Sequence, residues 1–300
     1  MTTISRDKLF FAFSPANPPV AHIKQGEMVT LETHDCFEGQ LQTSSDMINN
    51  LNWEHVNPAT GPVYIEGVQP GDVLRIELVE IEIAEQSCMV TLPGEGVLGG
   101  RIKEMETTIL RREGNQLIFK DKIRVEKKPM IGVIGVAPAE GSVANGTPGL
   151  HGGNMDCTLI GQGNRVYFTA AVAGALFGAG DLHAAMGDGE IVVCGAETAG
   201  KVQFKPQVVP LSGLPTPFVE TPELVATIFS ALTLDEAAQG ATEHMADFLT
   251  RFVNIPLNDA GMLMSLVGEL KFCQVVDPLK TVRFEFPKNV LQQYNYQLPA

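Results

Sequence analysis

The stretch VLRIELVEIEI at residues 73–83 follows a Pro-Gly-Asp turn at residues 70–72 and indicates the fold class. Apolar residues alternate with others along it, which is the period of a half-buried β-strand. The alternation changes phase between Leu78 and Val79, and a β-bulge would absorb such a slip. The sequence therefore predicts one long, bulged strand here.

Strand patterns continue on both sides of this stretch through the first two thirds of the chain. Residues 28–34 alternate so that Glu32 and His34 face one way and Asp35 the other, and residues 130–137 form an apolar run typical of a buried strand. Residues 166–180 predict another buried strand followed by a tight loop. Residues 138–153 have no period, and so long an unpatterned loop is usually functional.

A 3.6-residue period begins after Pro206 and predicts helices near the C-terminus. We expect a first helix after Thr221, a second that starts at a capping box of Thr233 and Glu236, and a third after Asn258. Strands at residues 270–276 and 281–286 would complete this part. The sequence therefore predicts a β-rich α+β protein, with a catalytic body at 1–205 and a smaller α+β part at 206–300 packed on it as one catalytic unit.

Composition excludes several classes of partner. The 300 residues are 44% hydrophobic and 19% charged, as in a globular protein, and their net charge is −14. Nucleic acid or an anionic membrane needs a positive surface, which no Lys/Arg cluster supplies. No export signal or membrane span is recognisable, and five cysteines without CxxC spacing fit a reducing cytoplasm.

Two glycine-rich segments carry clustered ionisable residues. The first, HGGNMD, runs from His151 through Asn154 to Asp156. The second, GDLHAAMGDGE at residues 180–190, is followed shortly by Glu197; its ionisable residues are Asp181, His183, Asp188 and Glu190. Crowded carboxylates repel one another unless a cation or a proton lies among them, and imidazole with carboxylate oxygens suits zinc or a similar divalent ion. The pattern predicts a metal site.

Other interpretations of these residues stay open. Asp188-Gly189 is also a type I′ hairpin signal, and a single His in such a region is often structural. Cys36, Cys157 and Cys194 offer a rival cysteine nucleophile for amide cleavage, although buried cysteines are common. A non-enzymatic domain whose loops are stabilised by calcium or zinc is a further alternative.

Two glycine motifs match nucleotide-binding loops only in part. Residues 94–99 fit G-x-G-x-x-G, yet residues 107–110 predict a strand where a dinucleotide site needs a helix. Residues 195–201 resemble the start of a P-loop, but Val202 replaces its Ser or Thr. Nucleotide binding is therefore disfavoured.

The motifs together resemble the acetamidase/formamidase family. The resemblance is carried by His34-Asp35, residues 68–74, the two glycine-rich segments and Glu197, in order and spacing, and it favours the shorter, acetamidase-like branch. It implies a fold of β-sandwich and β-barrel elements with a small α+β part. It also implies a homo-oligomer, taken as a dimer, that hydrolyses formamide, acetamide or a related short amide to the carboxylate and ammonia.

Residues and resemblance together lead to one mechanistic hypothesis. One or two divalent ions, zinc or else calcium, would be held by metal ligands at the following positions: His34, Asp35, His151, Asp156 and His183. Glu197 is the expected general base, and Asn154 would stabilise the oxyanion. Asp188 and Glu190 would orient the ligands. We also expect His151 and His183 to meet at a single site.

Overall fold

Residues 73–83 form one strand, β7 (Val73–Ile83), in the computed structural model, which describes residues 2–299. Along its whole length β7 pairs with β18 (Gly200–Val209) in antiparallel register. Gln203 lies opposite Glu80 and Phe204 opposite Leu78, so Val79 has no partner in this pair. The predicted bulge is therefore confirmed at the residue where the alternation changes phase.

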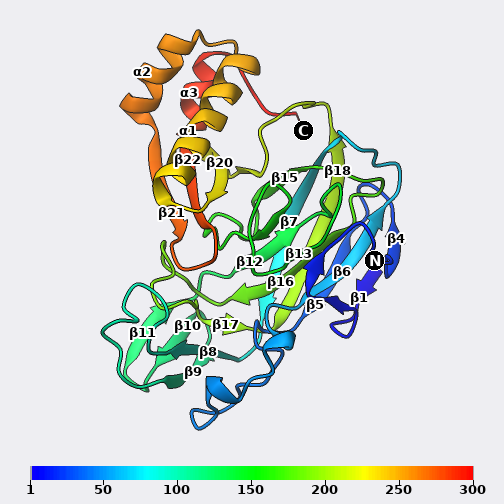
Figure 1. The fold of residues 1–300 in the computed structure, drawn as a ribbon. Helices are drawn as coiled ribbons and strands as arrows, with labels where there is room; N and C mark the ends of the chain where they lie inside the picture. Colours follow the sequence, from blue (N-terminus) through cyan, green and yellow to red (C-terminus); the bar gives the residue numbers. More distant parts are fainter. Residues whose placement is uncertain (1, 300) are drawn as a thin grey trace.

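A first sheet is built around this pair, and its strands come from almost the whole length of the sequence (Figure 1). Its strands follow in the order β1 (Thr2–Ile4), β5 (Val29–Thr33), β18, β7, β15 (Arg165–Thr169), β19 (Phe218–Glu220), β20 (Leu224–Ala231), β22 (Lys280–Pro287) and β21 (Glu269–Gln274). Because β18 spans residue 205 and β15 pairs with β19, the sheet continues across the predicted boundary between the two parts.

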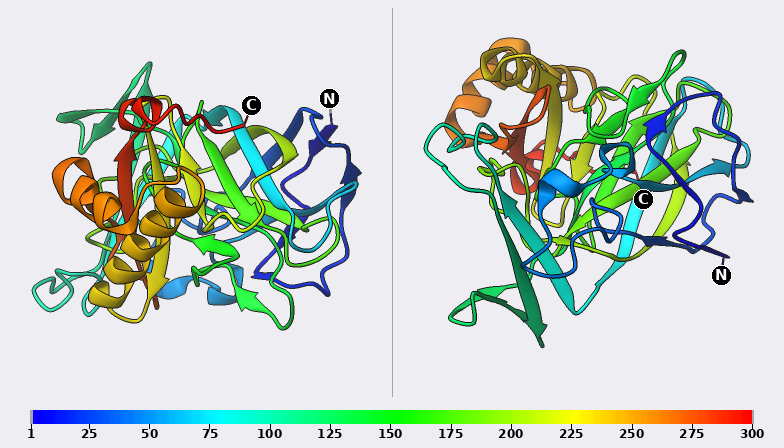
Figure 2. Two further views of the ribbon diagram at one scale, coloured as in Figure 1. Left: turned by 90° about the horizontal axis from the view of Figure 1, so that it is seen from above. Right: turned by 60° about the horizontal axis from the view of Figure 1, so that its bottom comes forward.

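A second sheet carries the glycine-rich segments. Its main path runs β11 (Ile123–Glu126), β10 (Gln116–Phe119), β9 (Glu106–Glu113), β8 (Gln86–Thr91), β17 (Glu197–Thr198), β16 (Phe177–His183), β12 (Met130–Gly135) and β14 (Gly152–Asn154). β6 (Ala59–Ile65) pairs with β16 and also with β2 (Leu9–Phe10) and β4 (Ala21–Ile23). A short pair joins β3 (Ala12–Phe13) to β13 (Val143–Ala144). β8 to β11 project from the body (Figures 1 and 2).

The main core lies between the two sheets. Leu31 and Ile76 of the first sheet and Ile131 and Phe177 of the second belong to one buried apolar cluster. Two sheets that bury their inner faces against each other form a sandwich. The predicted β-rich class is therefore confirmed.

Helices of the last third cover one end of the first sheet (Figure 1). They are α1 (Leu234–Arg251), α2 (Leu257–Val267) and α3 (Lys288–Gln293), and they pack on β20 and β22 around a second apolar cluster. The capping box is confirmed: Thr233 Oγ1 accepts from the Glu236 backbone N–H, and the Glu236 carboxylate accepts from that of Thr233. Among the described residues, none of the helices has the length and apolar character that a bilayer span needs.

The helix predicted after Thr221 is wrong, because residues 224–231 form strand β20 between β19 and β22. Val225 to Ile228 are all buried, so the strand carries apolar residues on both faces, and such a run cannot be told from a helix by period alone. Thr221 instead accepts hydrogen bonds from the backbone of Glu223 and Leu224 in the turn before the strand.

Candidate active site

The site is formed where β16, β17 and β12 meet. His183 of β16 lies directly opposite Glu197 of β17, and Asp181 precedes His183 by two residues on the same strand. β12 pairs with β16 on its other side and with β14, whose end leads to Asp156. Three segments that are distant in sequence thus bring their ionisable groups to one place.

These groups are close together and almost fully buried. Nε2 of His183 lies 3.2 Å from Oε2 of Glu197, 3.5 Å from Oδ1 of Asp181 and 3.8 Å from Oδ1 of Asp156. Side-chain atoms of Asp156, His183 and Glu190 lie within 4.8 Å of one another. The predicted ligands Asp156 and His183 therefore do converge, and Glu190 and Glu197 join them.

Burial and mutual repulsion disfavour ionised carboxylates here. Burial, followed by the charges of Glu190 and Asp277, raises the pKa of Asp156 well above its usual range. Burial also raises the pKa of Glu197 to about 7, although His183 opposes the shift. The pKa of His183, which burial alone would lower, is raised overall by the carboxylates of Glu197 and Asp181.

The cluster leaves buried polar atoms without partners. Within residues 2–299, neither oxygen of Asp156 receives a hydrogen bond, and neither ring nitrogen of His183 makes one of good geometry. Asp181, Glu190 and Glu197 each have one buried carboxylate oxygen that likewise has no hydrogen-bond partner in this part of the chain. Buried polar atoms are nearly always satisfied, so this set of imidazole and carboxylate donors fits a divalent cation. The chain thus contains groups suited to metal binding, whereas the identity of the ion stays a prediction.

The backbone at the cluster is held in an unusual conformation. Asp156, Asp181 and Glu190 have φ values of 45°, 53° and 49°, in the left-handed region that residues with a Cβ rarely adopt. Such strain persists only where the surrounding structure enforces it, and it gathers at functional sites. Gly132 of β12 makes room beneath, since a Cβ there would lie 2.5 Å from oxygens of both Asp156 and Asp181.

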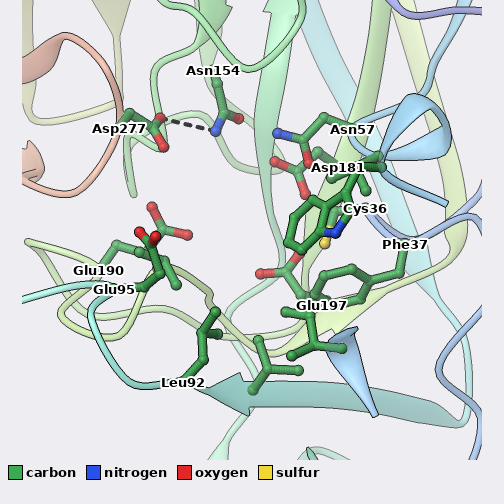
Figure 3. A pocket seen from close by; sticks show the side chains of 15 residues that line it. Cys36, Phe37, Asn57, Leu92, Glu95, Asn154, Asp181, Glu190, Glu197 and Asp277 are labelled. Atoms are coloured by element: carbon green, nitrogen blue, oxygen red, sulfur yellow. Dashed lines mark hydrogen bonds between the residues drawn. The ribbon is translucent and has the colours of Figure 1, made fainter. Parts of the chain in front are cut away.

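A cavity of about 320 Å³ opens onto this cluster (Figure 3). Its lining residues are Cys36, Phe37, Ile48, Trp53, Val56, Asn57, Val90, Leu92, Glu95, Asn154, Asp181, Glu190, Val193, Glu197 and Asp277. Asn154 donates through Nδ2 to Oδ2 of Asp277 at 2.9 Å, and its Oδ1 has no partner in the described chain. The cavity therefore has a polar floor and an apolar wall, as ligand pockets commonly do.

Three of the predicted site residues have other partners or line another cavity. Oδ1 of Asp35 accepts hydrogen bonds from the backbone of Phe37 and Gly39, which is a turn-stabilising role. His34 and Asp35 line a smaller cavity of about 170 Å³ that Glu197 also touches. Asp188 forms a bidentate ion pair with Arg283 instead of reaching the cluster.

The expectation that His151 and His183 share one ion does not hold in this structure. His183 pairs with Met130, whereas the backbone of His151 bonds to Val136, so the two residues lie about 20 Å apart along β12. The ring of His151 packs against that of Phe13. Burial lowers its pKa to about 4, with no charged neighbour contributing.

The structure also adds residues that sequence reasoning missed. Asp277, in the turn between β21 and β22, lines the cavity, and burial together with the charge of Asp181 raises its pKa to about 7. An Asp before a Pro between two strands signals only a turn, so no local pattern could have found it. Asp181 belonged to the noted motif without being assigned a role.

Comparison with known proteins places this geometry in a family. The model of the acetamidase/formamidase family matches residues 3–146 and 143–227. The chain belongs to the acetamidase/formamidase family. Membership assigns it to the amidases, enzymes that hydrolyse linear carbon–nitrogen bonds.

Two solved relatives agree with this chain in fold over nearly its whole length. An acetamidase from Bacillus halodurans is 41% identical, with a TM-score of 0.96 over 98% of this chain and 100% of that one. A predicted acetamidase/formamidase from Thermoanaerobacter tengcongensis is 44% identical, with the same TM-score over 99% of each chain. A formamidase from Methylophilus methylotrophus is 25% identical over 75% of this chain and 72% of its own length.

Proposed function

We propose that this amidase hydrolyses short aliphatic primary amides such as acetamide and formamide, with a divalent ion bound at its buried cluster. The observation that carries the proposal is the set of unpartnered groups of Asp156, His183 and Glu190 beside a cavity of about 320 Å³. Asp181 lies within reach as a further ligand. A bound divalent ion supplies Lewis-acid polarisation of an amide carbonyl.

The chain's own residues account for substrate binding and proton movement. Glu197 takes the proton of the attacking water at Oε2, while its Oε1 is held by the backbone N–H of Gly195 at 2.7 Å. The same carboxyl then gives the proton to the leaving nitrogen as the C–N bond breaks, so that the carboxylic acid and ammonia are formed. The acid passes its own proton to ammonia, which yields carboxylate and ammonium. Asn154, fixed by Asp277, offers its free Oδ1 to the substrate N–H and its second amide hydrogen to the developing oxyanion.

Ammonia release from acetamide and formamide by metal-free and reconstituted protein tests the proposal. The protein is stripped with a chelator, checked by elemental analysis, and reconstituted with Zn²⁺ or Ca²⁺ in separate samples. We expect loss of turnover on stripping and recovery with one of the two ions. Full turnover by verified metal-free protein would refute the metal mechanism.

The rival cysteine mechanism centres on Cys36, which lines the cavity. Burial and the negative charges of Glu197 and Asp181 raise the pKa of its thiol well above the usual range. A nucleophilic cysteine needs a lowered pKa, because the thiolate is the reactive form. The high pKa of Cys36 therefore disfavours the cysteine mechanism.

The homodimer and the cytoplasmic location stay predictions. Light scattering can test whether the protein is a dimer.

A further inference from the structure

The cavity above the cluster is lined by acidic residues and by no basic ones. Of its lining residues in the described chain, none is Lys, Arg or His, and five carry carboxyl groups: Glu95, Asp181, Glu190, Glu197 and Asp277. Asp156 lies just behind them, where protons or a bound cation offset the charge of the buried carboxyls. Among the described lining residues, no cationic side chain is present to neutralise a carboxylate that lies outside this cluster.

Glu95 is the carboxylate that lies outside the buried cluster. It is exposed, and it belongs to the glycine-rich turn at residues 94–99 that resembles a phosphate loop only in sequence. The turn is attached to the segment after Glu190: the N–H of Val97 donates to the carbonyl of Ile191 at 2.9 Å. A Cβ at Gly96 would lie 2.6 Å from the same carbonyl oxygen, so this close contact requires glycine. The attachment holds Glu95 at the cavity on the side of Glu190 (Figure 3).

An aromatic and aliphatic wall completes the cavity away from the floor. It includes Phe37, Val56 and Trp53, and Trp53 keeps 59% of its surface exposed. Apolar walls accept the methylene groups of an acyl chain, and an aromatic face also attracts a cation. A substrate whose amide reaches the floor would therefore extend its tail between this wall and Glu95.

We propose that this enzyme discriminates among short amides by the charge of the acyl tail, with Glu95 as the specificity-determining residue. Primary amides that end in an ammonium group are favoured over neutral amides of the same shape, and amides that end in a carboxylate are rejected. The proposal rests on the proposed amidase function at the same site, and it concerns only the choice among its substrates.

Matched pairs of substrates separate charge from shape. β-Alaninamide has the shape of butanamide with a positive end, and malonamate has the shape of 3-methylbutanamide with a negative end. From a charge pair partly screened by water, we expect kcat/KM to be about five-fold higher for β-alaninamide than for butanamide and about ten-fold lower for malonamate than for 3-methylbutanamide. Added salt should shrink both ratios.

The Glu95→Gln variant tests whether Glu95 causes the preference for β-alaninamide over butanamide. It should lower the ratio of kcat/KM for β-alaninamide to that for butanamide by about three-fold, because only β-alaninamide has a charged tail to interact with this carboxylate. Glu243→Gln, which removes an exposed carboxylate from α1, is the matched control and should change neither ratio.

The outcomes separate the two proposals. Absence of turnover for every amide, acetamide included, would contradict the proposed function. Acetamide turnover with equal kcat/KM within each matched pair, or a preference for malonamate, would overturn the charge selectivity. A β-alaninamide preference that survives in Glu95→Gln would overturn the role given to Glu95.

Discussion

The Nε2 atom of His183 lies 3.2 Å from the Oε2 atom of Glu197, between two strands in which these residues are directly opposite. Both side chains are almost fully buried, and His183 makes no hydrogen bond of good geometry within residues 2–299. The imidazole and the carboxylate are this close without forming a hydrogen bond of good geometry. This arrangement suits a third group, such as a water molecule or a cation, that contacts both.

Replacing Glu197 with Gln tests its role in proton transfer. The variant keeps the shape of the side chain and an oxygen that accepts the hydrogen bond from the N–H of Gly195. It cannot take up a proton at the amide nitrogen that replaces Oε2. General acid–base catalysis contributes about 10² to 10⁴ in rate, so we expect kcat for acetamide to fall at least about 100-fold. Ammonia release measures the rate, and an unchanged melting temperature confirms the fold. A kcat within a few-fold of the unmodified enzyme would exclude Glu197 as the base.

Alanine variants of two histidines should behave differently. His183→Ala removes a proposed ligand from the cluster, so we expect metal content and turnover to fall together. His151→Ala should keep the metal, because its ring lies at Phe13, far along β12 from the cluster, and lose only packing. Elemental analysis of both purified proteins decides between the arrangements. Loss of metal in His151→Ala would restore it as a ligand.

Gly132→Ala places a methyl group against the floor of the site. Its Cβ would lie 2.5 Å from carboxylate oxygens of Asp156 and Asp181, closer than real contacts allow. We expect the carboxylates to be displaced and both metal binding and kcat/KM to fall at least about ten-fold, since small displacements in an active site are costly. Gly261→Ala in α2, where a Cβ meets no atom within 4 Å, is the control and should keep activity. Wild-type metal affinity in Gly132→Ala would show that the two carboxylates do not hold the ion.

Cysteine variants test the rival mechanism. Cys157→Ala and Cys194→Ala should retain most activity, because both residues are buried and neither lines the cavity. Cys36→Ala should retain at least about a tenth of the activity, whereas loss of a nucleophile costs far more. Should Cys36→Ala lose all turnover while keeping its metal and its fold, the cysteine mechanism would replace the one proposed.

Stability at acidic pH should depend on Glu220. Burial would raise its pKa, but the ammonium of Lys288, the hydroxyl of Tyr167 and the guanidinium of Arg165 together lower it below the usual glutamate value of 4.5. Because the pKa of Glu220 is lower in the folded than in the unfolded protein, its ionised carboxylate stabilises the fold at pH values above 4.5. This contribution is lost as the pH falls toward the pKa of Glu220 in the folded protein.

Glu220→Gln should therefore lower the free energy of unfolding near pH 7 by about 1 to 3 kcal/mol. The difference from the unmodified protein should shrink as the pH is lowered to about 3. Urea denaturation at several pH values measures both quantities, with exposed Glu243→Gln as the control. A difference that stays constant over this range would show that ionisation of Glu220 does not contribute to stability.

The sequence by itself determined the features that depend on near neighbours in the chain. Alternation at residues 73–83 predicted both the strand and its bulge at Val79, because side chains of a strand point to opposite faces. Thr233 and Glu236 predicted the start of α1, because a cap is made within one turn. The glycine-rich segments likewise indicated where Asp156, His183 and Glu197 would supply ionisable groups.

Tertiary structure alone decided which of these groups meet. The registers of β12, β14 and β16 separate His151 from His183, and the turn between β21 and β22 brings Asp277 to Asn154 across 123 positions of sequence. The sequence of strand β20 predicts a helix for a related reason: both faces of the strand are covered, so the sequence lacks the alternation that exposure to water imposes. Local sequence records which side chains are buried, whereas pairing between distant strands sets the distances on which a catalytic site depends.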